Sequence, residues 1–193
     1  MDTMRPETEN NLIDKASVGD LDAFNNLIDR YKNQVFHLSL KILKIREDAE
    51  EVAQDVFLKL YKNIKKFDKK ARFSTWVYRI TYNECISRIR KKKRNLNIDS
   101  LENLEFQLQL VETEFEKVDI DKKKELIERS LNVLDEESKT IVLFYYYYDK
   151  SVAEIGDIVG LTESNTKIRL FRARKKLLHF FEKKLMLKKQ DLL

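Results

Sequence analysis

The chain has 193 residues, which allows one or two domains at roughly 150 residues per domain. Three Gly and one Pro are too few for the tight turns and bulges of a sheet-rich protein, so we expect an all-α fold. The formal net charge is +5, and the single Cys excludes an intrachain disulfide framework and a cysteine-rich zinc cluster.

The N-terminal third predicts a series of helices from its apolar periodicity. A first helix is expected to begin near Leu12. Apolar residues at helical spacing over 24–43 predict a second helix, with Asp20 or Asp22 as its N-cap. We expect a polar break at 46–48 before the next helix.

That next helix, expected over 48–64, has two different faces. Its apolar inner face comprises Ala49, Val52, Ala53, Val56, Phe57 and Leu60. Its outer face is polar with one leucine, and comprises Glu51, Gln54, Asp55 and Leu58. An apolar side chain on an acidic face favours contact with a protein partner. The alternative is an ordinary solvent-exposed leucine.

A basic loop is expected over 65–73, because this segment has little periodicity and many Lys. The helix after it is expected to begin at a cap on Ser74 or Thr75 and to run to about Lys93. It interleaves aromatic rings with bases, a pattern that suits single-stranded or melting DNA, since rings stack on unpaired bases and cations hold the backbone. The alternative is that the rings form core and the charged groups are solvated.

Charge is strongly segregated along the chain. Residues 71–94 hold eight bases and one acid, residues 95–116 hold six acids and no base, and residues 163–189 hold ten bases and two acids. Such segregation indicates partners of opposite charge for different segments.

The acidic segment divides the chain into two expected domains. It is weakly periodic as well as acidic, so we expect a flexible linker over 95–118. The domains on either side are expected at 11–94 and 119–185. Helical periodicity returns in the second domain and predicts helices over 122–134 and 135–148.

A helix-turn-helix is predicted over 151–177. Ser151 and Glu154 have capping-box spacing, and Gly160 is placed to end the first helix. The second helix should pack an apolar stripe inward, made of Thr166, Leu170, Ala173 and Leu177. Its opposite stripe is polar and basic, made of Asn165, Arg169, Arg172 and Lys176, with Lys167 nearby. A DNA-reading helix needs this division between an anchoring face and a face of amide and guanidinium groups. The alternative is a solvated basic helix in an ordinary bundle.

No catalytic constellation is apparent in the sequence. There are two His, and three Gly cannot build a common phosphate-binding loop, so we expect no enzyme, no cofactor and no metal site. The N-terminus is polar and acidic, which predicts no signal peptide. No apolar run approaches about 18 residues. We therefore expect no membrane insertion and a cytoplasmic location.

Taken in order, these motifs resemble a known family. The segments GDLDAFNNLIDRYKNQVFHLSLKIL, REDAEEVAQDVFLKLYKNI and FDKKARFSTWVYRITYNECISRIRKKKR resemble sigma domain 2. The segment LDEESKTIVLFYYYYDKSVAEIGDIVGLTESNTKIRLFRARKKL resembles sigma domain 4. The resemblance covers about 11–94 and 120–185. Without a middle domain, this order is similar to that of extracytoplasmic-function sigma factors, the smallest class of the sigma-seventy family.

The resemblance implies a non-enzymatic subunit that directs RNA polymerase to promoters. The implied partners are the clamp and flap of core polymerase, promoter DNA and an anti-sigma factor. The residues implied to bind core polymerase are Glu51, Gln54, Asp55 and Leu58. Those implied to bind the melted −10 element are Lys66, Lys69, Lys70, Arg72, Phe73, Trp76, Arg79, Asn83 and Arg90. Those implied to bind the −35 element are Ser164, Asn165, Lys167, Arg169, Arg172 and Lys176. The acidic linker is implied to occupy the path of RNA in the polymerase.

Three features depart from the family pattern. Residues 164–166 are Ser-Asn-Thr where relatives often have Gly-Thr-Val, so the −35 sequence cannot be transferred. Gly156 replaces a usual Ala at a cost of about 1 kcal/mol, and we expect it to loosen the first helix of the pair. The run Tyr145 to Tyr148 is expected to pack within domain 4, with a regulator-binding surface as the alternative.

Two rival functions remain open at the level of sequence. A stand-alone helix-turn-helix regulator would bind promoters tightly without polymerase, but it would need a dimer interface or a sensor domain. A helical adaptor for RNA or acidic proteins would not discriminate between DNA sequences.

Overall fold

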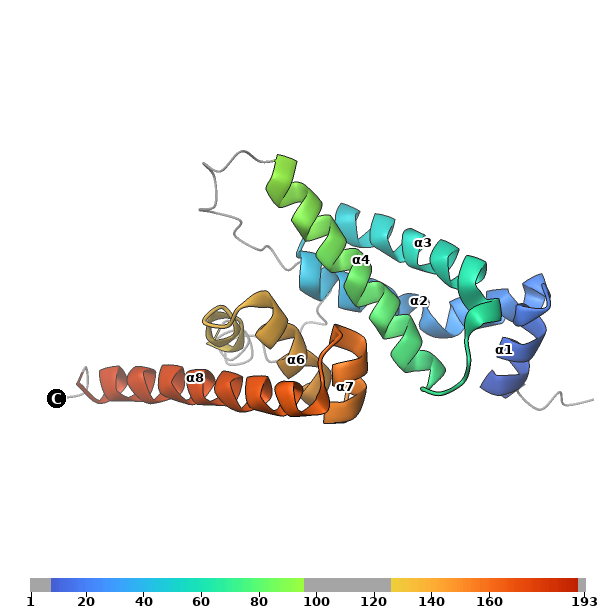
Figure 1. The fold of residues 1–193 in the computed structure, drawn as a ribbon. Helices are drawn as coiled ribbons and strands as arrows, with labels where there is room; N and C mark the ends of the chain where they lie inside the picture. Colours follow the sequence, from blue (N-terminus) through green and yellow to red (C-terminus); the bar gives the residue numbers. More distant parts are fainter. Residues whose placement is uncertain (1–7, 96–125, 191–193) are drawn as a thin grey trace, which may run out of the picture. The chain divides into compact units, whose positions relative to one another are not determined.

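Two helical units make up the structure, a computed structural model that describes the backbone of residues 8–95 and 126–190 and the side chains of 8–92 and 126–182 (Figure 1). Every regular element in these ranges is a helix, which confirms the all-α prediction. Chain contacts divide the molecule between Leu104 and Glu105. The linker predicted over 95–118 falls, apart from its first residue, outside the described residues. Among the helices that are described, none is both long and apolar enough to cross a membrane.

The first unit is a small helical bundle with one helix at its centre. Its elements are α1 (Glu9–Ser17), α2 (Leu21–Leu43), α3 (Arg46–Asn63), the 3-10 turn η1 (Ile64–Lys66) and α4 (Phe73–Asn95). The central helix α2 packs against α1, α3 and α4, and α3 also packs against α4 (Figure 1). The segment between η1 and α4 is therefore a loop whose two ends are held by packed helices.

The ends of α2 follow from local chemistry. The side chain of Asp20, rather than that of Asp22, caps the helix by accepting a backbone N–H of the first turn at 3.0 Å. The helix ends at Lys44, which adopts a left-handed conformation with φ of 61°. The polar break predicted at 46–48 is wrong, because these residues form the first turn of α3. Acidic side chains are favourable there, next to the positive end of the helix dipole.

The start of α4 also differs from the sequence-based expectation. The helix begins at Phe73, so the cap predicted at Ser74 or Thr75 is wrong. The Arg72 carbonyl accepts the N–H groups of Thr75 and Trp76 at 3.0 and 3.2 Å. The chain therefore enters the helix directly from the basic loop.

The core of the first unit is built from one stripe of each helix. Its fully buried side chains include Leu12, Leu27, Val35, Leu38, Val52, Val56, Leu60, Ile64 and Val77. Burying one such side chain contributes about 1.5–3 kcal/mol. Four of the six residues of the inner face predicted for α3 are buried, and Ala53 and Phe57 are partly buried. Because this face of α3 is buried, the opposite face must point to solvent.

The second unit contains a helix pair packed on a third helix. Residues 126–131 are helical, and they are followed by α6 (Glu136–Tyr146), α7 (Val152–Val159) and α8 (Glu163–Gln190). Asp135 caps α6 by accepting the Ser138 N–H at 2.9 Å. The predicted capping box at the start of α7 is present, and Gly160 ends that helix with φ of 78°. The helix-turn-helix predicted over 151–177 is thus confirmed in its helices and its turn.

Gly156 sits where α7, the turn and α8 approach one another closely. A Cβ atom at this position would lie 2.7 Å from the Leu161 carbonyl oxygen and 3.3 Å from Thr166 Oγ1. The first of these atoms belongs to backbone and cannot move aside cheaply. The glycine therefore permits tight packing of the pair, where sequence alone predicted only a looser helix.

Candidate functional site

The outer face of α3 presents the four side chains predicted to contact a protein. Glu51, Gln54, Asp55 and Leu58 are all exposed, and Leu58 retains 56% of its accessible surface. The opposite face of the helix is buried, so this row cannot turn inward. The geometry provides an acidic strip with one apolar side chain, Leu58, at its C-terminal end.

An ion-pair cluster joins this face of α3 to the basic end of α4. Asp48 is largely buried and accepts hydrogen bonds from Arg88 and Lys92, and Arg88 also pairs with Glu51. The Glu51 carboxylate, followed by that of Asp48, raises the pKa of the Arg88 guanidinium against the opposing effect of burial. Two of the bases near the end of α4 are therefore paired within the protein.

An aromatic cluster underlies the loop between η1 and α4. Phe73 is only 4% exposed, and its ring lies 5.5 Å from Tyr31 and 5.3 Å from Phe67, both edge-to-face. Trp76 is partly exposed and stacks on Phe67 with centroids 5.1 Å apart. Among the residues predicted for −10 binding, Phe73 is thus placed to support the surface, while Trp76 reaches it.

The loop bases are arranged in two groups. Lys69 pairs with Asp14 of α1, and Lys70 pairs with Asp68 at 2.8 Å. The hydrogen bond that the Lys70 ammonium donates to the Asp68 carboxylate raises the pKa of Lys70 and lowers the pKa of Asp68. The remaining predicted side chains, Lys66, Arg72, Arg79, Asn83 and Arg90, are exposed. Lys69 thus pairs across to α1 and Lys70 pairs within the loop, while the other predicted cations are exposed.

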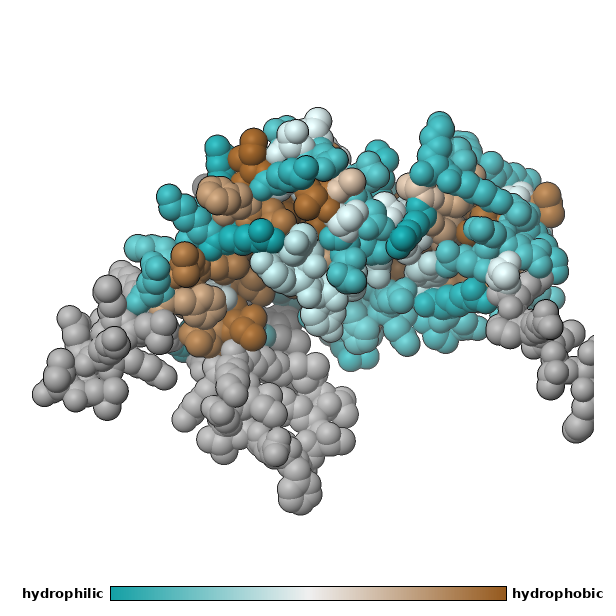
Figure 2. All heavy atoms as spheres, turned by 90° about the horizontal axis from the view of Figure 1, so that it is seen from below, coloured by the Kyte–Doolittle hydropathy of each residue, from teal (hydrophilic) through white to brown (hydrophobic). Residues whose placement is uncertain are grey.

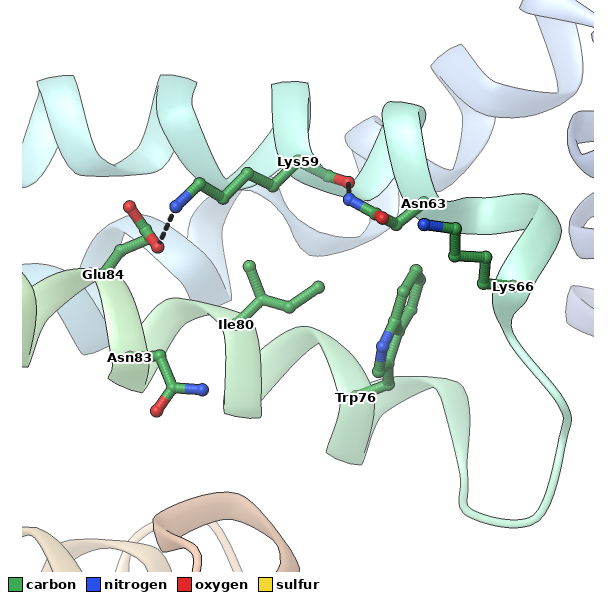
Figure 3. Close-up of a pocket in the computed structure, with 7 residues that line it drawn as sticks. All are labelled: Lys59, Asn63, Lys66, Trp76, Ile80, Asn83 and Glu84. Carbon is green, nitrogen blue, oxygen red and sulfur yellow. Dashed lines mark hydrogen bonds and ion pairs between the residues drawn. The ribbon is translucent and has the colours of Figure 1, made fainter.

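A pocket of about 360 Å³ opens between α3 and α4, beside this loop (Figure 3). It is lined by Lys59, Asn63, Lys66, Trp76, Ile80, Asn83 and Glu84. Lys66, Trp76 and Asn83 were predicted as site residues, and the structure brings these three together.

The other four lining residues were missed by sequence reasoning. Lys59 and Asn63 are four residues apart on α3, and Ile80 and Glu84 are four apart on α4. Such spacing places each pair on one helix face. The four-residue spacing could be seen in the sequence of each helix. The pocket itself forms only because the two helices pack against each other.

In the second unit, α8 has the predicted division of faces. Thr166, Leu170 and Ala173 are buried. Ser164, Asn165, Lys167, Arg172 and Lys176 are exposed, and Arg169 is partly exposed. Lys167 pairs with Glu163 and Arg169 with Glu137, each at 2.6 Å. Exposed pairs of this kind contribute roughly 0–1 kcal/mol, so an incoming phosphate can replace them.

Sequence reasoning also missed an apolar edge on the same helix. Ile168, Phe171 and Leu178 are exposed, and Phe171 retains 67% of its surface. Figure 2 shows apolar atoms reaching the surface among hydrophilic side chains. The spacing of three and seven residues follows one side of the helix, a signal that was available in the sequence.

The tyrosine run holds an arginine of α8. The Arg174 guanidinium lies 4.8 Å from the Tyr145 ring centroid and 5.5 Å from that of Tyr146, and its Nε donates to Tyr146 Oη at 2.9 Å. Tyr146 and Tyr147 are nevertheless mostly exposed. The run therefore both packs and presents aromatic surface.

Among the described residues, no three or more His, Cys, Asp or Glu side chains are grouped so that they could hold a metal ion. Cys85 lies on the buried side of α4, and burial raises the pKa of its thiol to about 12. A thiol with so high a pKa is a poor nucleophile, because the thiolate is the reactive form.

Comparisons with known proteins agree with both units. The model of Sigma-70 region 2 matches residues 27–95, and that of Sigma-70, region 4 matches residues 124–177. The chain is 34% identical over 172 residues to the ECF RNA polymerase sigma factor SigW of Bacillus subtilis, covering 86% of this chain and 92% of the relative. It is 27% identical over 174 residues to the ECF RNA polymerase sigma-E factor of Haemophilus influenzae, covering 86% and 92%.

A solved structure shares the fold. The sigma factor RpoE in complex with the anti-sigma factor NepR, from Bartonella quintana, has a TM-score of 0.66 at 19% identity and covers 82% of this chain and 96% of its own. Sequence identity over nearly the whole chain, two matched regions and the helix pair lead to one assignment. The chain belongs to the extracytoplasmic-function (ECF) sigma factors of the sigma-70 family, the specificity subunits of RNA polymerase.

Proposed function

We propose that this sigma factor divides promoter recognition between its two units. The first unit docks on core polymerase and captures the melted −10 strand, and the second reads the −35 duplex. The observation that carries the proposal is the exposed polar stripe of α8 opposite its buried stripe. The domain limits 11–94, 95–118 and 119–185 are part of the same proposal.

The −35 element is assigned to the exposed side of α8. Arg172 and Asn165 offer donor groups of the kind that pair with base edges in the major groove. Lys167 and Lys176 are placed for phosphates, which set position and salt dependence rather than sequence choice. The exposed ring of Phe171 adds an apolar contact suited to a thymine methyl group.

The −10 element is assigned to the loop and to α4. Trp76 offers a ring for stacking on an unpaired base, worth about 1–3 kcal/mol. The exposed cations hold the strand backbone, and these are Lys66, Arg72, Arg79 and Arg90. Lys69 and Lys70 are ion-paired at the surface, so a strand phosphate competes with Asp14 and Asp68 for them. Asn83 is one of the residues that line the adjoining pocket.

The outer face of α3 is assigned to core polymerase. An acidic strip that ends at Leu58 suits a basic partner surface with an apolar contact beside it. We assign this face to the clamp, and the second unit to the flap. The acidic segment between the units is assigned to the path of RNA, where a negatively charged chain substitutes for phosphates.

Regulation by an anti-sigma factor is part of the proposal. The similar RpoE structure contains a sigma factor bound to such a regulator. We assign this protein to the cytoplasm, where polymerase and promoter DNA are present.

The test is run-off transcription with purified core polymerase, the full chain and a library of promoter fragments. We expect enrichment of fragments with two short elements, and no enrichment without the chain. A library from which no fragment is enriched would rule the function out. Tight promoter binding by the chain alone would instead favour a stand-alone regulator.

A further inference from the structure

An arginine of α4 is shared by two carboxylates of α3. The Arg88 guanidinium pairs with Glu51, and it also lies 3.3 Å from a carboxylate oxygen of Asp48, which is long for an N–H···O hydrogen bond. Lys92, one turn further along α4, pairs with Asp48 as well. Because α3 and α4 pack along each other (Figure 1), the cluster joins two carboxylates of one helix to two bases of the other.

The two carboxylates hold Arg88 unequally. The Asp48 side chain is 10% exposed and divides its charge between two bases, whereas the Glu51 side chain is 62% exposed and pairs with Arg88. The hydrogen bond to Glu51 is the largest influence that raises the pKa of Arg88. Arg88 therefore depends mainly on Glu51, and Asp48 keeps Lys92 as a partner if Arg88 leaves.

Glu51 and Arg88 lie on two different proposed surfaces. Glu51 is part of the acidic strip of α3 that is assigned to core polymerase. Arg88 is four residues from Glu84, which lines the pocket between α3 and α4, and two residues from the exposed Arg90, which is assigned to the −10 strand. Residues four apart share one face of a helix. A single ion pair thus connects the surface for polymerase with the surface for DNA.

The partners of this pair can be exchanged at small cost. Exposed ion pairs contribute little to folding stability, since water solvates both groups when they separate. A basic group of polymerase that takes the Glu51 carboxylate leaves one negative charge, that of Asp48, beside two positive charges. The surplus positive charge favours an incoming phosphate, which a guanidinium binds through two parallel hydrogen bonds.

We propose that Arg88 is a conditional phosphate contact: Glu51 holds it in the free protein, and docking of Glu51 on core polymerase releases it to the DNA backbone. The inference rests on the proposed function, because it needs both surfaces. Linkage between two binding events is reciprocal. A phosphate that takes Arg88 therefore also frees Glu51 for polymerase.

The first measurement uses the full chain without polymerase and a fluorescent single strand of mixed sequence, at one fixed salt concentration. Glu51→Gln removes the charge that holds Arg88, as docking does, and should tighten binding of the strand about fivefold, the size of one net hydrogen bond. The double variant Glu51→Gln/Arg88→Gln should lose this gain. The control Glu50→Gln also removes one negative charge but releases Arg46 instead. It should change the affinity by less than about twofold, because salt screens a single surface charge.

The second measurement uses core polymerase. Arg88→Gln leaves Glu51 without its competitor, so the affinity for core polymerase should rise about fivefold. The resulting holoenzyme should bind a promoter fragment selected by transcription about fivefold more weakly than wild type. A residue that only joined α3 to α4 would weaken both affinities, so opposite changes identify a shared residue. Thermal unfolding of every variant is measured in parallel.

Three results overturn the proposal: unchanged strand binding by Glu51→Gln, an equal gain in Glu50→Gln, or an affinity of Arg88→Gln for core polymerase that does not rise. Absence of promoter preference in the wild-type holoenzyme overturns the proposed function instead. The first measurement needs neither polymerase nor a promoter, so it still decides whether Glu51 holds Arg88.

Discussion

The two surfaces assigned to DNA are built in different ways. The −35 surface is one side of a single helix, α8, whose register alone determines which side chains are exposed. The −10 surface combines α3, α4 and the loop between them, and its partly exposed Trp76 rests on Phe67 and on the buried ring of Phe73. A surface on one helix tolerates the loss of a side chain. A surface assembled from several elements depends on the packing beneath it.

The largest expected effect is on that packing. Phe73→Ala removes a buried ring from the aromatic cluster and should lower the unfolding free energy of the first unit by about 3–5 kcal/mol. Chemical denaturation is followed by far-ultraviolet circular dichroism, which reports both units, and by the fluorescence of Trp76, which reports the first unit. The matched control is Phe171→Ala, whose ring is exposed on α8 and whose loss should leave stability nearly unchanged. Equal destabilisation by both would refute the contrast.

The next effect concerns recognition rather than folding. Arg172→Ala should weaken binding of the polymerase complex to −35 DNA by about 1–3 kcal/mol and relax preference at one position. Its control on the same helix is Arg174→Ala, because Arg174 is held by Tyr145 and Tyr146. Competition binding at fixed salt measures both. A similar loss from Arg174→Ala would place the DNA-binding face elsewhere on α8.

A third change tests how tightly the helix pair is packed. Gly156→Ala places a methyl group 2.7 Å from the Leu161 carbonyl oxygen. Despite the better helix propensity of Ala, we expect the second unit to lose about 1–3 kcal/mol through overpacking. Calorimetry of the full chain resolves this, because the first unit should keep its transition. A raised Tm would show that propensity outweighs the close contact.

The smallest effect is that of the cap on α6. Burial raises the pKa of Asp135, the residue that caps the helix. Hydrogen bonds from the Ser138 N–H and hydroxyl outweigh burial and lower this pKa overall. A carboxyl with a lowered folded-state pKa stabilises above its unfolded pKa of about 3.9, and the contribution is lost as pH falls through the folded value. Asp135→Ala should cost about 1 kcal/mol at pH 7. The difference from wild type should shrink as pH falls below about 4, and a constant difference would exclude the cap.

The features that could be predicted from sequence are those determined by a few neighbouring residues. The capping box at Ser151 and Glu154 and the glycine end of α7 depend on local hydrogen bonds and φ angles. The two faces of α3 and α8 depend only on helical periodicity. The left-handed turn at Lys44 was missed because lysine carries no signal for that conformation, and this error displaced the start of α3.

The pocket could not be predicted, for a different reason. Lys59 and Glu84 meet because α3 and α4 pack in one particular register, and no spacing within either helix specifies that register. The fit around Gly156 is of the same kind, since it depends on the backbone of the following turn. The sequence thus predicted the faces of single helices, but not these two contacts between packed elements.

The ion-pair cluster on α3 changes how the charge of the basic segment is counted. Of the eight bases in 71–94, Arg88 and Lys92 are already neutralised by Asp48 and Glu51. Each phosphate that a base neutralises on single strands adds about 0.7 to the slope of log affinity against log salt. If both stay paired, the segment releases two fewer counterions than its composition suggests, and the slope is smaller by about 1.4.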